Sequence, residues 1–260
     1  DEQGRVADAE PLLRRALDVQ ERTVGPDHPQ TAYTLTVLAI LLRKRAKTDE
    51  AEALLRRALA IRERELGPDH PRVGLVLNNL AVVLADRGEY QAAEACCRRA
   101  LTLYEQALGQ DSANVAVTLH NLAGVHRARG ELDAAERIYR RSLAIRERTL
   151  GPDHPTIAYH LTSLANVLQK EGRLDEAHAG ATRALAISRK TAGTGHLTVT
   201  RALTVLARIA AERGGTAEAA DLFRQALENS RRTLGPEHRG TLQIEAEYAR
   251  LLDGRREAWA

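Results

Sequence analysis

The pentapeptide GPDHP occupies residues 25–29, 67–71 and 151–155, and degenerate copies stand at 109–113 (GQDSA), 193–197 (GTGHL) and 235–239 (GPEHR). Their leading glycines follow one another at intervals of 42 residues, with no insertion or deletion: Gly25, Gly67, Gly109, Gly151, Gly193 and Gly235. Self-similarity at a fixed period of this length indicates a repeat architecture. The sequence therefore predicts one structural unit that recurs along the whole chain.

Each unit contains a second landmark between two successive copies of the loop. It is a glycine in five units and an alanine in one: Gly4, Ala46, Gly88, Gly130, Gly172 and Gly214. Two landmarks divide the unit into two segments, such as NVAVTLHNLAGVHRARG at 114–130 and ELDAAERIYRRSLAIRERTLG at 131–151. Apolar residues recur in both at intervals of three and four, the pattern of amphipathic helices. A pair of helices per unit is therefore predicted, and no strand.

The boundaries of these helices follow from glycine and proline. A glycine in the left-handed conformation ends a helix at low cost, which places Gly25 and its equivalents after the second helix of each unit. Proline is tolerated in the first helical turn, which places Pro29, Pro71 and Pro155 at the start of the first helix. We expect first helices at 30–46, 72–87, 114–129, 156–171, 198–213 and 240–252. We expect second helices at 5–24, 49–66, 90–108, 132–150, 174–192 and 216–234.

Small residues recur at fixed positions of both predicted helices. They are Ala39, Ala81, Ala123, Ala165, Ala207 and Ala249 in the first helix, and Ala51, Ala93, Ala135, Ala177 and Ala219 in the second. Over the entire chain this pattern resembles the tetratricopeptide repeat (TPR), in the 42-residue form of kinesin light chains and their bacterial relatives. The resemblance implies that these small residues pack against each other where the two helices of a unit cross. The resemblance implies an all-α, right-handed superhelical solenoid of antiparallel helix pairs. It would form a single domain over residues 1–260 with half-repeats at both ends.

The resemblance also implies that the first helices line a concave surface that binds a peptide or a partner protein. Asparagine can both donate to and accept from a peptide backbone, and residues 78–81 (NNLA) are similar to the groove of kinesin light chains. Tyr33, Leu75, Ile40 and Val82 would form apolar pockets, and later repeats are more basic. We expect a partner with an apolar anchor and acidic residues. The predicted contacts are Tyr33, Thr36, Arg43, Asn78, Asn79, His120, Asn121, Arg127, Tyr159, Asn166, Lys170, Arg201 and Arg208.

The sequence allows two other interpretations of this surface. These residues could simply be solvated helix positions without a ligand. The clamp for a C-terminal carboxylate found in some members of the family needs lysine and arginine partners around a central asparagine. The corresponding positions in the first three repeats hold Thr36, Ile40, Asn79, Val117 and Asn121, and only the central asparagine matches the clamp. We therefore do not expect that clamp.

Composition and charge argue against several kinds of partner. The 38 basic and 35 acidic residues leave a net charge of only +3, too small to predict binding to nucleic acid or an anionic membrane. Arginine pairs at 14–15, 56–57, 98–99 and 140–141 could form a basic stripe. However, a glutamate four residues before the first arginine of each pair would neutralise it. No apolar run is long enough to cross a membrane.

No motif predicts catalysis, a metal or a cofactor. The chain has no phosphate-binding glycine loop, HExxH or GxSxG sequence. The loop histidines recur one per repeat, so neighbours would lie about 10 Å or more apart, too far for one zinc ion. Cys96 and Cys97 are adjacent and poorly placed to form a disulfide, so a reducing, cytoplasmic location is expected. We expect no enzymatic activity.

The leading functional hypothesis is a protein-interaction scaffold. The chain starts inside a repeat and contains no methionine, which suggests a segment of a larger signalling or regulatory protein. The alternative is a self-association module, in which a lone second helix and a lone first helix stack end to end as homo-oligomers.

Overall fold

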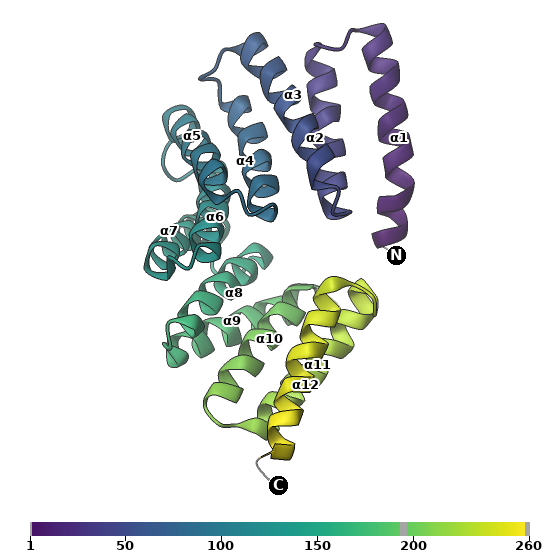
Figure 1. The fold of residues 1–260 in the computed structure, drawn as a ribbon. Coiled ribbons are helices and arrows are strands. Elements are labelled where there is room, and N and C mark those ends of the chain that lie inside the picture. Colours follow the sequence, from purple (N-terminus) through teal and green to yellow (C-terminus); the bar gives the residue numbers. More distant parts are fainter. Residues whose placement is uncertain (1, 193–196, 258–260) are drawn as a thin grey trace. The chain divides into compact units, whose positions relative to one another are not determined.

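The computed structural model describes residues 2–192 and 197–257, and these form twelve helices and no strand (Figure 1). The helices are α1 (Glu2–Thr23), α2 (Pro29–Lys44), α3 (Thr48–Leu66), α4 (Pro71–Asp86), α5 (Tyr90–Leu108), α6 (Ala113–Ala128), α7 (Leu132–Leu150), α8 (Pro155–Lys170), α9 (Leu174–Ala192), α10 (Leu197–Glu212), α11 (Thr216–Leu234) and α12 (Arg239–Glu257). Even-numbered helices are called A helices and odd-numbered ones B helices. The prediction of an all-α repeat is confirmed, and ten of the twelve helices lie within two residues of their expected bounds. The degenerate loop at 193–196 lies outside the described residues.

The chain divides into two compact units, residues 1–138 and 139–260. In unit 1, α2 packs against α3 and α4 against α5, and each B helix also contacts the next A helix. In unit 2, α8 with α9 and α10 with α11 are arranged in the same way. One continuous solenoid over both units stays a prediction.

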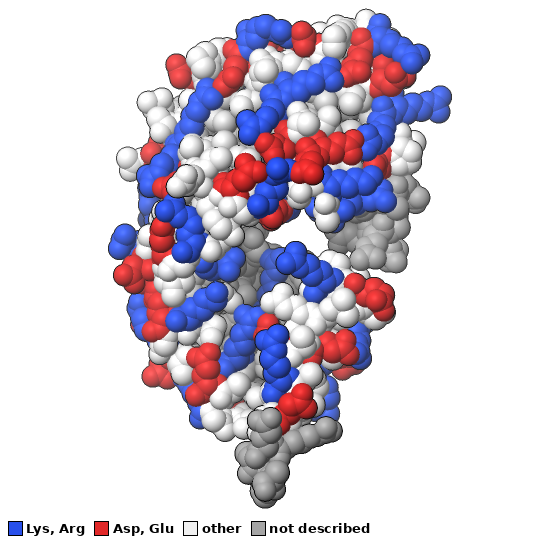
Figure 2. Space-filling view, viewed as in Figure 1, with Lys and Arg blue, Asp and Glu red and all other residues white. Residues whose placement is uncertain are grey.

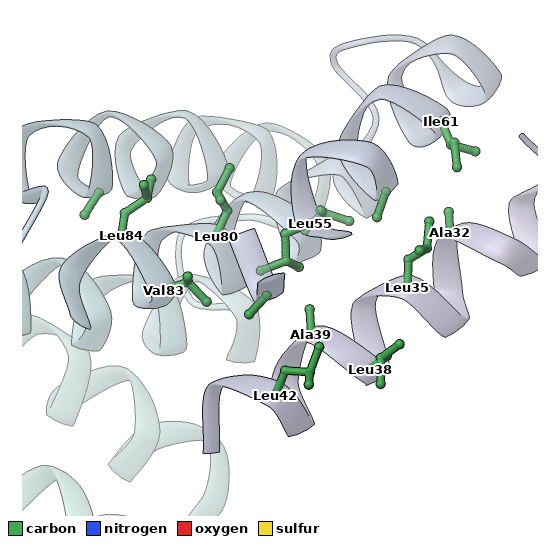
Figure 3. Close-up of a cluster of buried hydrophobic side chains, with 14 of the residues drawn as sticks. Ala32, Leu35, Leu38, Ala39, Leu42, Leu55, Ile61, Leu80, Val83 and Leu84 are labelled. Atoms are coloured by element: carbon green, nitrogen blue, oxygen red, sulfur yellow. The ribbon is translucent and has the colours of Figure 1, made fainter. Parts of the chain in front are cut away.

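The core of unit 1 consists of small and branched aliphatic side chains. Ala39 of α2 and Ala51 of α3 are fully buried, as the crossing of small residues predicts. Figure 3 shows Leu35 and Leu42 of α2 in one cluster with Leu80 and Leu84 of α4. Because alanines let the helix axes approach, the leucines beside them fill the remaining space.

Histidine caps four of the A helices, a role that the sequence did not predict. The Nδ1 atoms of His28, His70, His154 and His238 accept hydrogen bonds of 3.0–3.2 Å from the backbone N–H two residues later. Ser112 caps α6 by accepting from Val115 N–H at 3.3 Å. The histidines therefore satisfy a donor that would otherwise lack a partner at the helix start.

The arginine pairs on the B helices have two different roles. The first arginine pairs with the glutamate four residues earlier, as predicted, in Arg14–Glu10, Arg56–Glu52 and Arg98–Glu94. The second reaches the preceding repeat instead. Arg99 on α5 donates to Glu63 of α3 at 2.5 Å and to the carbonyl oxygen of Pro68, in the following loop, at 3.0 Å.

The same two-partner bridge occurs at Arg57 and Arg183. Their guanidinium groups reach Glu21 and Glu147, respectively, and the carbonyl oxygens of Pro26 and Pro152. Figure 2 shows basic and acidic side chains interleaved over the face in view, without a large area of one sign. The arginine stripe thus joins repeats to one another rather than presenting a continuous basic surface.

Candidate functional site

The A helices of unit 1 share a face on which large apolar side chains are exposed. Helix α4 lies beside both α2 and α6. Tyr33, Leu75 and Val117 occupy equivalent positions on the three helices and are 63%, 51% and 37% exposed. We call this row and its neighbours on α2, α4 and α6 the helix-A face of unit 1. A contiguous exposed apolar row is typical of a surface that binds another molecule.

A second row of this face carries the amides. Asn79 and Asn121 are half-buried, one turn after Leu75 and Val117. Asn79 Nδ2 donates to the carbonyl oxygen of Leu75 at 2.9 Å, and Asn121 Nδ2 donates to Asn78 Oδ1 at 3.0 Å. These bonds hold both amides in defined orientations beside the apolar row.

Three of the predicted contacts lie under the surface rather than on it. Thr36, Asn78 and His120 are only 6%, 9% and 6% exposed. Thr36 Oγ1 donates to the carbonyl oxygen of Ala32 at 2.8 Å, and Asn78 accepts from Asn121. Their positions serve the packing of neighbouring A helices, and we leave them out of the proposed binding surface.

The C-terminal ends of the A helices form the rim of the face. Arg43 on α2 pairs with Asp86 on α4 at 2.9 Å, so its charge is neutralised within the protein. Ile40 is exposed and Val82 half-buried just inside this rim. Arg127 on α6 is half-buried at the position equivalent to Arg43. In unit 1 the face is therefore chiefly apolar with amides, rather than basic.

Unit 2 presents a different chemistry at the equivalent positions. The guanidinium carbon of Arg201 on α10 lies 5.2 Å from the ring centroid of Tyr159 on α8, and both side chains are exposed. Asn166 is half-buried, and Lys170 is exposed at the end of α8. An aromatic ring with a cation on its face therefore lies at the positions where α4 and α6 carry Leu75 and Val117.

Arg208 is engaged within the protein. Its Nε and one terminal nitrogen contact the two carboxylate oxygens of Glu247 on α12, both at 2.7 Å. Burial alone would raise the pKa of Glu247, but the hydrogen bonds and charge of Arg208 lower it below its ordinary value. This bidentate pair leaves Arg208 less able to bind a partner than predicted. The positions equivalent to Asn79 in the later repeats hold Asn121, Ser163, Val205 and Glu247. Following these equivalent positions to the last repeat could have revealed the pair.

The described residues contain no group of three His, Cys, Asp or Glu side chains that could hold a metal ion. Burial raises the pKa of both thiols, that of Cys97 to about 12, which disfavours the reactive thiolate. None of the helices in the described part of the chain is long and apolar enough to span a membrane.

Comparison with known proteins agrees with the helix-pair architecture. The tetratricopeptide repeat family matches at residues 2–64, 38–106, 72–148, 114–190 and 156–232. A kinesin light chain-like protein from Podosopora anserina with nearly identical TPR-like repeats is 25% identical, with a TM-score of 0.64 over 80% of this chain and 98% of its own. BtubC (BKLC) from P. vanneervenii shares the fold at 21% identity, with a TM-score of 0.68 over 87% and 90% of the two chains. No curated protein matches the sequence. Because the family's repeat recurs over most of the chain, the protein belongs to the tetratricopeptide repeat family.

Proposed function

We propose that this protein is an interaction scaffold that binds a peptide or a peptide-like segment of a partner protein on its helix-A face. Tetratricopeptide repeats generally mediate interactions between proteins. The observation that carries the proposal is the exposed row of Tyr33, Leu75 and Val117, which lies beside oriented asparagine amides. The B helices, in contrast, carry charges that are largely paired within the protein.

The apolar row provides the binding free energy in this proposal. Burying an exposed leucine or tyrosine side chain against a partner contributes about 1.5–3 kcal/mol. Two or three such contacts, with hydrogen bonds from Asn79 and Asn121, would offset much of the entropy that is lost on association, so we expect a reversible complex of modest affinity. The partner segment would therefore carry apolar residues spaced to meet successive A helices.

The test uses the intact chain and a random peptide library displayed on phage. We expect wild-type protein to enrich peptides with apolar residues at fixed spacing. A Tyr33→Ser/Leu75→Ser variant should lose these peptides without unfolding, because both side chains are exposed. The matched control is Leu108→Ser/Leu150→Ser, which removes exposed leucines from the ends of B helices. This control variant should still bind the peptides that wild-type protein enriches. Failure to enrich any peptide, or equal loss in both variants, would reject the proposal.

Self-association is a second candidate, favoured by an exposed apolar surface on α1. Leu12 and Val19 are 68% and 50% exposed, whereas Ile61, the equivalent of Val19, is 2% exposed. In the other repeats an A helix covers this side of the B helix, so an A helix of a second copy could cover it here. Light scattering over a wide concentration range tests this. Oligomers that a Leu12→Ser/Val19→Ser variant disperses would support it, and a monomer at every concentration would reject it.

A further inference from the structure

We propose that α12 of one copy of this protein packs against α1 of a second copy, and that the two helices together complete one A–B hairpin. This inference rests on the self-association candidate above and names the surface that covers α1. In the complete hairpins an A helix packs against the B helix that follows it, as α8 does with α9 and α10 with α11. Within the described residues no A helix precedes α1 and no B helix follows α12 (Figure 1).

Helix α1 exposes the side that other B helices bury. Leu12 and Val19 are the large exposed side chains on this side. Ala16 lies between them and is exposed as well, whereas Ala58, at the equivalent position of α3, is fully buried. The residues equivalent to Val19 are at most 5% exposed in the other B helices. They are Ile61, Leu103, Ile145, Ile187 and Asn229.

Helix α12 exposes the side that other A helices turn toward their B helix. Leu242 is 48% exposed, whereas Ala158, at the equivalent position of α8, is fully buried. Ala249 is exposed too, although the alanines at the equivalent positions are fully buried. The last repeat of a solenoid that ends in solvent usually carries a polar outer face. The apolar residues on this side of α12 are instead those of a helix that packs against another neighbour.

A contact inside the hairpin of α8 and α9 shows which residues would meet at the helix crossing. A Cβ atom at Gly180 of α9 would lie 3.6 Å from Ala165 Cβ of α8. Counting along the chain in whole repeats, the position of Gly180 corresponds to Leu12 and that of Ala165 to Ala249. Leucine opposite alanine already occurs at these positions in the hairpin of α2 and α3. Leu12 of one copy is therefore expected to pack on Ala249 of another.

A second contact shows that the two helices match in size. In the hairpin of α10 and α11, Asn229 Nδ2 donates to Thr200 Oγ1 at 2.7 Å, and the equivalent residues are Val19 of α1 and Leu242 of α12. The complete hairpins place glycine, alanine or threonine on the A helix opposite isoleucine, leucine or asparagine on the B helix. Helix α12 has the largest residue of its set, and α1 has the smallest aliphatic residue of its set. This exchange of volume between the two helices favours each as the partner of the other.

The two surfaces are different, so the contact is heterologous rather than symmetric. Helix α1 of each copy would receive α12 of the next, and copies would add head to tail. A contact between two α1 helices would place two B helices together and would leave the exposed side of α12 uncovered. The pairing of large with small residues therefore selects α12 of a second copy as the occupant of α1.

The experiment mixes two variants of the intact chain and follows their mass by light scattering. The α1 variant is Leu12→Ser/Val19→Ser, and the α12 variant is Leu242→Ser/Ala249→Glu. Each should raise the dissociation constant of the wild-type oligomer by about tenfold or more, because exposed apolar contacts are lost. A one-to-one mixture should form a dimer of limited size, since each variant keeps the surface that the other lacks.

A size exchange tests the predicted pair of residues without adding charge. Val19→Ile should weaken self-association by roughly fivefold or more, because the longer side chain would overpack against Leu242. Adding Leu242→Ala should restore it, since the result is the alanine and isoleucine pair of Ala32 and Ile61. The matched control is Leu108→Ser/Leu150→Ser, which removes exposed leucines elsewhere and should leave the oligomer unchanged.

The outcomes distinguish this inference from self-association in general. Oligomers that the α1 variant disperses and the α12 variant does not would overturn the pairing with α12 and leave self-association through α1 standing. Two variants that are monomeric alone and remain monomeric when mixed would also overturn the pairing. A wild-type chain that is monomeric at every concentration would reject both, and peptide binding on the helix-A face would stand or fall by its own test.

Discussion

Ser142 Oγ on α7 lies 3.0 Å from His160 Nδ1 on α8, and both side chains are buried. The other repeats place alanine opposite an aliphatic residue or threonine at these positions, as in Ala58 and Val76. This repeat has therefore replaced an apolar contact with a hydrogen-bonded pair. Because a buried polar group needs a partner, the two substitutions are coupled.

The pair predicts acid sensitivity in this repeat. Burial, together with the nearby charge of Arg146, lowers the pKa of His160 from 6.5 to about 4. The unfolded chain therefore takes up this proton first, and stability is lost as the pH falls from 6.5 through 4. The loss should reach on the order of 3 kcal/mol. Urea unfolding at several pH values measures it.

The control for this measurement is Ser142→Ala/His160→Val, which restores the pair found at Ala58 and Val76. All other titrating groups are shared, so the difference between the two proteins isolates His160. The double variant should lose less stability between pH 6.5 and 4. Equal losses would show that His160 is not kept neutral by the fold.

The histidine caps predict a modest and specific loss of stability. Replacing His70 with alanine removes the acceptor for Arg72 N–H and should cost about 1 kcal/mol of unfolding free energy. His70→Ser should retain most of the stability that the cap contributes, because Ser112 caps the equivalent helix in another repeat. Urea denaturation of the three proteins makes the comparison, and a serine variant as weak as the alanine one would contradict the capping role.

The two arginines of one pair should contribute differently to the free energy of unfolding. Arg99 bridges two elements of the preceding repeat, whereas among the side chains that the structure describes Arg98 pairs only with Glu94, on its own helix. Arg99→Ala should therefore destabilise the protein by about 1 kcal/mol, and Arg98→Ala by about 0.5 kcal/mol or less. Chemical denaturation at low and high salt checks the order, and a larger loss for Arg98→Ala would refute it.

Gly74 and Tyr104 are matched to each other. A Cβ atom at Gly74 would lie 2.9 Å from Tyr104 Cζ, although equivalent positions hold alanine in Ala32, Ala116 and Ala158. Gly74→Ala should cost about 1–3 kcal/mol through overpacking, despite the better helix propensity of alanine. In a Tyr104→Ser background the same change should stabilise. The sign reversal, measured as a double-mutant cycle, is the expected result, and additive effects would contradict it.

Ala46 offers a stabilising substitution. It has a φ of 59° at a position where Gly88 has 81°, and it is the one non-glycine residue with positive φ in the described part of the chain. Alanine is strained in this region by about 1–2 kcal/mol. Ala46→Gly should raise the thermal midpoint and Gly88→Ala should lower it. If both substitutions shifted the thermal midpoint in the same direction, the turn would adapt to either residue and the strain at Ala46 would be refuted.

The helices and their order were predictable from the sequence, because glycine and proline mark their ends and the period never drifts. The small residues at the helix crossings were also placed correctly, as the burial of Ala39 and Ala51 shows. These features are local, or they repeat at a fixed distance, so a single sequence contains enough information to recognise them.

The candidate site was less predictable. Thr36, Asn78 and His120 are polar and were assigned to the surface, yet each A helix packs against neighbours on two sides and covers them. Amphipathic periodicity reports the apolar side of a helix, but not the polar residues that a second neighbour buries. The Arg208–Glu247 pair joins different repeats at non-equivalent positions, so the sequence indicates it only when the positions equivalent to Asn79 are followed as far as Glu247.

The bridging arginines limit how the chain length can vary. Each reaches back 31 residues to a proline carbonyl and 36 residues to a carboxylate, as at Arg57, Arg99 and Arg183. An extra residue in the intervening loop or helix would shift one acceptor relative to the other and break the pair of contacts. Such an array can therefore lengthen or shorten by whole modules far more easily than by single residues.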